Sequence, residues 1–269
     1  MKNKKKYLFV LTAIILVLLL TNAVCLAADG SATNEFWSKM YEKLHNNFIK
    51  DNRWKYLTTG LGTTLIISFF AVIVGIVLGF IIAILRSTCD MVDKPNILTK
   101  TINGILKTYI TVIRGTPALI QLLIIYYVIF TSPDISKTVV AIISFGLNSS
   151  AYIAEIVRSG IMSVDVGQFE AGRSLGFTHA QTMWHFILPQ AFKNILPALG
   201  NEFIVLIKET SIAGYIGIAD LTKGGDIIRS RTYEPFLPLI SVALIYLIIV
   251  MILTAPVSKM ERRLRTDGK

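Results

Sequence analysis

The chain has 269 residues, of which 53% are hydrophobic and only 16% are charged. A soluble domain carries roughly a quarter charged residues, so this composition excludes an ordinary soluble protein and indicates an integral membrane protein. The formal net charge of +10 does not indicate nucleic-acid binding, because the cytoplasmic loops of membrane proteins collect Lys and Arg and face anionic lipid headgroups.

An apolar run at residues 7–28 opens the chain, and four lysines precede it: Lys2, Lys4, Lys5 and Lys6. This pattern fits either a cleaved signal peptide, with Leu26-Ala27-Ala28 as its small-residue exit, or a retained N-terminal anchor helix. Both interpretations leave residues 29–56 as an extracytoplasmic segment of mixed charge.

Five further apolar runs approach or exceed the length of about 20 residues that crosses a bilayer. They cover residues 57–85, 110–130, 137–157, 191–218 and 236–257. In the first run, Gly75 and Gly79 have the GxxxG spacing that lets helices approach closely. We therefore expect an all-α integral membrane protein with a five-helix core at residues 57–260 and a short tail at residues 261–269.

The second run is broken near its start by Gly115 and Pro117. A broken helix frees amide and carbonyl groups, which a membrane tolerates only where the backbone is buried in protein or lines a polar cavity. Arg114, beside the break, has the planar fork that matches a carboxylate. Alternatively, Arg114 lies at the cytoplasmic rim and contacts lipid phosphate or a neighbouring subunit.

Ionisable residues lie inside the third and fourth runs, where they are costly and usually face a cavity or a partner. Glu155, which shares a helical face with Tyr152, either faces such a cavity or forms an ion pair with Arg158. Lys208 and Glu209 either line the cavity or tie two subunits together, and the same two alternatives hold for Glu202.

A polar segment at residues 165–190 separates the third and fourth runs. Asp165 with Gln168, and Thr178 with Gln181, each fit the capping box that starts a helix. Gly176 fits a left-handed helix stop between them. The segment is thus predicted to be an ordered pair of short helices.

The end of this segment and its exposed apolar side chains give two further expectations. Pro189 cannot continue a hydrogen-bond ladder, so the second helix should end near residue 188. Phe169, Leu175 and Phe177 cannot be buried by short helices alone, so the segment should have a docking partner.

Lys and Arg fall on one side of the predicted spans. That side holds the N-terminal lysines, the loop at residues 86–107, the polar segment and the tail, whereas the loop at residues 219–235 balances both signs. Positively charged loops face the cytoplasm. The C-terminus is therefore predicted to be cytoplasmic.

The sequence lacks the motifs of several kinds of chemistry. It has no GxxxxGK[ST] phosphate loop, so the chain cannot hydrolyse ATP itself. No nucleophile and base are suitably placed, and the three histidines and two cysteines suggest neither a metal set nor a disulfide. We predict no catalytic residues, no metal, no cofactor and no nucleic-acid partner.

Four elements in this order resemble a known family. The segment with Glu170-Ala171-Gly172, Gly176 and Ile187-Leu188-Pro189 resembles the EAA loop of bacterial ABC importer permeases. Residues 114–121 (RGTPALIQ), 151–158 (AYIAEIVR) and 200–211 (GNE with KETS) resemble elements of the polar amino-acid branch. The resemblance runs from about Thr59 to Met260, and it departs at Gly172, where the family usually has a second alanine.

The resemblance implies a multi-pass permease subunit of an ATP-driven ABC importer for polar amino acids in the bacterial plasma membrane. Its partners would be a cytoplasmic ATPase dimer, an extracytoplasmic amino-acid-binding protein, a second permease, identical or related, and membrane lipid. Coupling would run through residues 161–190. The implied coupling residues are Phe169, Glu170, Ala171, Gly172, Leu175, Gly176 and Phe177.

A substrate path is also implied, in which Arg114 would bind a carboxylate and Glu155 an amino group. The candidate path residues are Arg114, Thr116, Gln121, Tyr152, Glu155, Lys208 and Glu209. Two alternatives belong to other classes. A secondary transporter driven by an ion gradient usually shows internal repeats, which are not visible here, and a membrane-embedded enzyme would need a reactive cluster.

Overall fold

The computed structural model describes residues 30–90, 95–132 and 134–266. Within these ranges all regular structure is helical and no strand occurs, which confirms the predicted all-α class. The apolar run predicted at residues 7–28 lies outside the described residues. The chain divides into two compact units, Met1–Trp54 and Lys55–Lys269.

The described part of the first unit, from residue 30, contains one α-helix followed by a tight turn. Helix α2 covers Gly30–Leu44, and a π-turn (His45–Ile49) and a 3-10 turn (Lys50–Asn52) follow it. Asp51 and Asn52 have φ of 56° and 53°, in the left-handed region that Asp and Asn tolerate better than most residues. Arg53 fastens the turn, because its guanidinium donates to the Asn46 carbonyl at 2.7 Å and to the Asp51 carboxylate at 2.9 Å.

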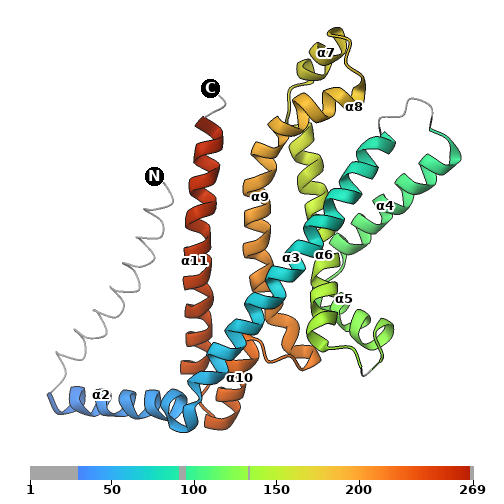
Figure 1. Cartoon of the computed structure of the whole chain (residues 1–269). Helices are drawn as coiled ribbons and strands as arrows, with labels where there is room; N and C mark the ends of the chain where they lie inside the picture. Colours follow the sequence, from blue (N-terminus) through green and yellow to red (C-terminus); the bar gives the residue numbers. More distant parts are fainter. Residues whose placement is uncertain (1–29, 91–94, 133, 267–269) are drawn as a thin grey trace. The chain divides into compact units, whose positions relative to one another are not determined.

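The second unit contains the predicted spans (Figure 1). Three described helices are long and apolar enough to cross a membrane: α3 (Trp54–Asp90), α6 (Lys137–Met162) and α11 (Phe236–Thr266). A bent pair would make a fourth span. It consists of α4 (Ile97–Gly115) followed by α5 (Ala118–Ile124) and a π-turn (Ile125–Ile129), with a bend of 111°. The break lies at Gly115 to Pro117, as predicted.

The run predicted at residues 191–218 forms helix α9 (Leu188–Glu209) and a 3-10 helix (Thr210–Ile216). Helix α9 is not among the described helices whose length and composition would let them span a membrane. Polar residues such as Lys193, Asn201 and Glu202 lower its hydropathy. Helix α10 (Leu221–Thr232) follows and leads to α11.

Helix α6 is the centre of the second unit. Of its most apolar stretch, 61% is buried, against 11% for α11, and it packs against α4, α5 and α9. The glycines of α3 approach it closely, as their spacing predicts. A Cβ at Gly79 would lie 2.6 Å from Ile153 Cγ2, and one at Gly75 would lie 3.0 Å from Ser149 Cβ.

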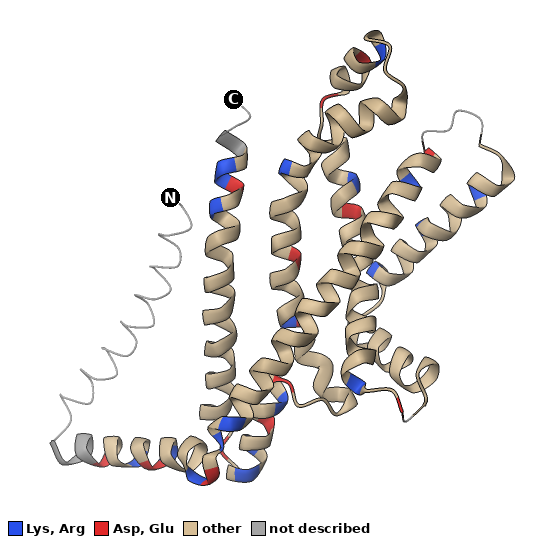
Figure 2. Ribbon diagram, in the orientation of Figure 1, with Lys and Arg blue, Asp and Glu red and all other residues tan. Residues whose placement is uncertain are grey.

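The ends of the second unit differ in character. Helices α7 (Val166–Ser174) and α8 (His179–Thr182) lie at one end and α10 at the other (Figure 1). Figure 2 shows α11 uncharged over most of its length, with Lys and Arg near its C-terminal end, which lies toward α7 and α8. The basic tail and the polar segment thus share one end, as the charge pattern of the sequence predicts.

The polar segment is an ordered helix pair, as predicted. Asp165 caps α7 by accepting from the Gly167 amide at 2.7 Å. Thr178 and Gln181 form a capping box at α8, and Gly176 has φ of 84°, so the left-handed stop is confirmed. The first capping box is wrong, because the side-chain Oε1 of Gln168 instead accepts from the side-chain amide of Gln190 at 3.2 Å.

The predicted helix end near residue 188 is also wrong. A π-turn (Met183–Ile187) follows α8, and α9 begins directly at Leu188 with Pro189 in its first turn. The first turn of a helix needs no amide donor, and the wider π-turn brings the chain into that turn without a break. The polar segment therefore runs into α9 as one helical path.

Candidate functional site

A largely open pocket of about 360 Å³, which we call the cavity, lies between α4, α6 and α9 and is lined by apolar as well as charged side chains. Three of the predicted path residues line it: Arg114 from the last turn of α4, and Tyr152 and Glu155 from α6. Asn194 and Glu202 complete the α9 wall. The break after Gly115 positions Arg114, because α4 ends there.

Arg114 is placed by an aromatic ring. Its guanidinium carbon lies 5.4 Å from the centroid of the Tyr152 ring, a distance at which the ring face attracts a cation. Among the described residues Arg114 forms no ion pair. Its fork is therefore oriented by Tyr152, and the Glu155 carboxylate acts on it only from beyond ion-pair distance.

Glu155 is held by two arginines. Its carboxylate accepts from Arg158 Nε at 2.9 Å, and Arg86 of α3 lies at 3.6 Å. The structure thus contains the ion pair with Arg158 while Glu155 also lines the cavity, so both alternatives hold, and it adds Arg86, which the sequence analysis missed. This cluster joins α3 to α6 at the edge of the cavity.

Glu202 provides a second carboxylate on the opposite wall. It accepts from the Ser149 hydroxyl at 2.9 Å, a contact between α9 and α6. No ion pair of Glu202 occurs within the described ranges. From the sequence, Glu202 was expected either to line the cavity or to tie two subunits together, and in the structure it lines the cavity.

The other predicted path residues do not line this cavity. Lys208 and Glu209 lie at the far end of α9. Gln121 is buried, and its amide donates to the Ile113 carbonyl at 2.7 Å and to the Thr116 carbonyl at 3.1 Å. Gln121 thus binds carbonyls of the broken turn that includes Thr116, and it contacts the backbone of the bend rather than the cavity.

Helices α7 and α8 and their π-turn expose a second candidate site, which we call the coupling surface. Leu175 (73% exposed) and Phe177 (37%) were predicted for it, and Val166 and Trp184, each 68% exposed, were missed. Glu170 and Ala171 are also exposed, whereas Phe169 packs partly into the core. The missed residues lie at the start of α7 and in the π-turn, where no sequence motif marks them.

Gly172 departs from the family pattern for a reason visible in its packing. It is buried in α7, and an added Cβ would lie 2.6 Å from Thr182 Cγ2 of α8. Because real Cβ atoms essentially never approach that closely, Gly172 allows α7 to contact α8. The glycine sets the spacing of the pair.

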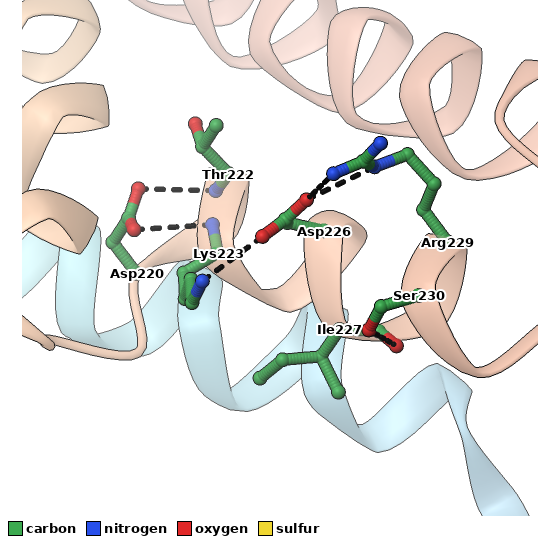
Figure 3. A network of polar contacts seen from close by, with 7 residues as sticks. All are labelled: Asp220, Thr222, Lys223, Asp226, Ile227, Arg229 and Ser230. Atoms are coloured by element: carbon green, nitrogen blue, oxygen red, sulfur yellow. Dashed lines mark hydrogen bonds and ion pairs between the residues drawn. The ribbon is translucent and has the colours of Figure 1, made fainter.

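A network of polar contacts organises α10 at the opposite end (Figure 3). Buried Asp220 caps the helix by accepting from the amides of Thr222 at 3.0 Å and Lys223 at 3.1 Å. Burial raises the pKa of Asp220, and these amides oppose the rise. Asp226 binds Lys223 at 2.9 Å and Arg229 Nε at 3.0 Å, and these two bonds lower the pKa of Asp226.

These features define a class of protein. Helices that can span a membrane, a broken helix beside a cavity that holds charged side chains, and an exposed apolar surface at one end together indicate a membrane transport component. The chain belongs to the family of binding-protein-dependent transport system inner membrane components, whose model matches residues 75–266. It is therefore a transport subunit and not an enzyme.

Several curated relatives cover most of the chain. A putative glutamine transport system permease protein of Rickettsia bellii is 41% identical over 214 residues, covering 78% of this chain and 93% of the relative. An L-cystine transport system permease protein of Bacillus subtilis is 36% identical over 223 residues, covering 81% and 90%. An arginine transport system permease protein of Bacillus subtilis is 36% identical over 214 residues, covering 79% and 94%.

Solved structures share the fold. An amino acid ABC transporter crystallised with histidines contains a chain 44% identical to this one, with a TM-score of 0.72, covering 80% of this chain and 98% of the other. The MetNI methionine ABC transporter in an inward-facing conformation is 20% identical with a TM-score of 0.66, covering 78% and 97%.

Proposed function

We propose that this chain is the permease subunit of an ATP-driven importer for polar amino acids. The observation that carries this is the cavity between α4, α6 and α9, which has a guanidinium on one wall and a carboxylate on another. The relatives, which include permeases named for glutamine, arginine and cystine transport, support the same substrate class.

The two ends of an amino acid fit two groups of the cavity. The fork of Arg114 matches the α-carboxylate, and Tyr152 beneath it fixes its orientation. Glu202 is the candidate partner for the α-ammonium group, because the charge of Glu155 is already matched by Arg86 and Arg158. The volume of about 360 Å³ is within the usual range for small-molecule sites, about 300–1,000 Å³.

The coupling surface is the proposed contact with a cytoplasmic ATPase dimer. Its exposed apolar side chains form a patch of the kind that marks a protein interface, and α7 and α8 continue into α9, which lines the cavity. A movement of the ATPase would thus be transmitted to the cavity along this continuous helical path. An extracytoplasmic binding protein, a second permease and a cytoplasmic C-terminus complete the proposal.

ATPase activity in proteoliposomes tests this function. The full chain is reconstituted with the ATPase subunit and the binding protein encoded beside it, and a panel of amino acids is added. We expect ATP hydrolysis and uptake to rise together with one loaded binding protein. Uptake that follows an ion gradient and needs no ATP would instead establish a secondary transporter.

The cavity is tested by the variant Arg114→Gln, with Arg229→Gln on α10 as its matched control. A hydrogen bond to a charged group contributes about 1.5–3 kcal/mol, so Arg114→Gln should lower uptake about 10- to 100-fold. Assembly with the ATPase should be unchanged in both variants. Wild-type uptake by Arg114→Gln would exclude Arg114 from substrate binding and leave the importer function standing.

A further inference from the structure

Helix α2 of the first unit separates its apolar and polar side chains completely along residues 35–44. At 100° per residue, Phe36, Trp37, Met40, Tyr41 and Leu44 fall within an arc of about 140°. The remaining five residues fall on the opposite arc: Glu35, Ser38, Lys39, Glu42 and Lys43. The helix is therefore strictly two-faced.

The apolar face of α2 is exposed. Trp37 is 52% exposed, Tyr41 70%, Phe36 42% and Leu44 42%. A helix of 15 residues is marginal in water by itself, and packing of its apolar face normally supplies its stability. The face thus needs a surface to cover it.

The position of α2 in the chain keeps it near the bilayer. The first helix able to span a membrane begins at Trp54, and the chain between Leu44 and Trp54 is wound into short turns that Arg53 fastens. At about 2 Å per residue such turns reach no more than about 20 Å. The helix is therefore tethered within reach of the membrane surface where α3 begins.

The chemistry of α2 fits the membrane–water interface. Trp and Tyr are the residues enriched at that depth, and helices with one apolar and one charged face lie in the interface plane. Two acids and two lysines balance on the polar face, with Lys39 paired to Glu35 at 2.6 Å. Because the positive and negative charges balance, the polar face has no net charge that would attract an oppositely charged protein.

We propose that α2 is an interfacial anchor that lies flat in the headgroup region of the bilayer, with Trp37 and Tyr41 toward the acyl chains. The anchor fixes the depth at which α3 enters the membrane. It does not depend on the proposed substrate or on the coupling surface.

Tryptophan quenching tests the anchor in the full-length chain. The chain has three tryptophans, Trp37, Trp54 and Trp184, so Trp54→Phe with Trp184→Phe leaves Trp37 as the reporter. The matched control adds Trp37→Phe and Ser38→Trp, which moves the indole to the polar face. Both are reconstituted in phosphatidylethanolamine and phosphatidylglycerol vesicles with nitroxide lipids labelled near the headgroup or near the chain end.

We expect the shallow lipid label to quench Trp37 at least about twofold more than the deep label, and acrylamide to quench it several-fold less than the control indole. Quenching of Trp37 by acrylamide at the level of the control would overturn the anchor. So would protection from both lipid labels and acrylamide, because protein would then cover the face.

A spin-label measurement keeps the proposal testable if the tryptophan variants fold poorly. Cys25 and Cys89 are first replaced by Ser. A nitroxide is then attached at Tyr41→Cys on the apolar face or at Glu42→Cys, the next residue, on the polar face. Oxygen should relax the label of Tyr41→Cys more strongly, and a water-soluble nickel complex that of Glu42→Cys. Equal accessibility of the two labels would contradict the proposed orientation.

Discussion

Gly172 shows how one residue sets the geometry of the coupling surface. Glycine is less favourable than alanine inside a helix by about 1 kcal/mol, so its presence in α7 has a cost. The close approach to Thr182, 2.6 Å for an added Cβ, is the gain that offsets it. Two opposing effects thus meet at one position, and a double-mutant cycle separates them.

We predict that Gly172→Ala lowers the free energy of unfolding by about 1–3 kcal/mol, the usual cost of overpacking. In a Thr182→Ala background the clashing methyl and hydroxyl are gone and only the Cβ of residue 182 remains close, at 3.2 Å, so the same change should cost less, with helix propensity in its favour. Thermal unfolding of the four purified proteins measures the difference. An equally destabilising Gly172→Ala in both backgrounds would show that Thr182 is not the obstacle.

Among the elements, the bend between α4 and α5 is where backbone carbonyls lose their usual partners. Pro117 has no amide hydrogen, so the Ile113 carbonyl cannot accept the helical bond from it. The side-chain amide of Gln121 supplies the donor instead, at 2.7 Å, and its side-chain oxygen accepts from the Asn148 amide of α6 at 2.8 Å. One side chain thus provides the hydrogen bond that the bend lacks and links the bend to the central helix.

We predict that Gln121→Leu destabilises the protein by about 2–4 kcal/mol, because each buried polar group left unpaired costs about 1–3 kcal/mol. Asn148→Leu should cost less, since the bend keeps its donor. The double variant should cost less than the sum of the two, because no orphaned Asn148 amide remains. Additive losses in thermal unfolding would argue against the Gln121 to Asn148 link.

This bend also shows which elements the sequence could predict. Gly115 and Pro117 break a helix by local chemistry, as Thr178 with Gln181 starts one, and both predictions are confirmed. The bond from Asn148 to Gln121 joins residues 27 positions apart, and no local pattern encodes it.

Local rules gave wrong or incomplete answers where a nearby alternative was available. Pro189 does not end a helix, because it follows a π-turn and lies in the first turn of α9, where a proline is tolerated. For Glu202 the sequence left two alternatives open, because its place in the cavity depends on how α9 packs against α6. The coupling motif found the exposed Leu175 but not Trp184, which has no motif of its own.

On the scale of the whole molecule, the two ends of the second unit have different surfaces. The coupling surface exposes Leu175 and Trp184, each about two-thirds exposed or more, whereas the α10 end combines the polar contacts of Asp220 and Asp226 with the exposed aromatic side chains of Tyr233 and Phe236. The charged network is confined to the α10 end, so the two ends suit partners of different kinds. A charge introduced at one end should therefore affect only the partner of that end.

We predict that Leu175→Glu with Trp184→Glu abolishes co-purification of the ATPase subunit, because apolar anchors in an interface are commonly worth more than 1 kcal/mol each and a buried unpaired carboxylate adds its desolvation cost. The matched control is Tyr233→Glu, which places a charge on a residue 93% exposed just after α10. Both variants should stay monodisperse with unchanged melting temperature, since the altered side chains lie at the surface. The control should retain the ATPase. If Leu175→Glu with Trp184→Glu also retained it and kept ATP-dependent uptake, the ATPase would have to bind elsewhere, and the exposed apolar residues of α7 and the π-turn would need another partner.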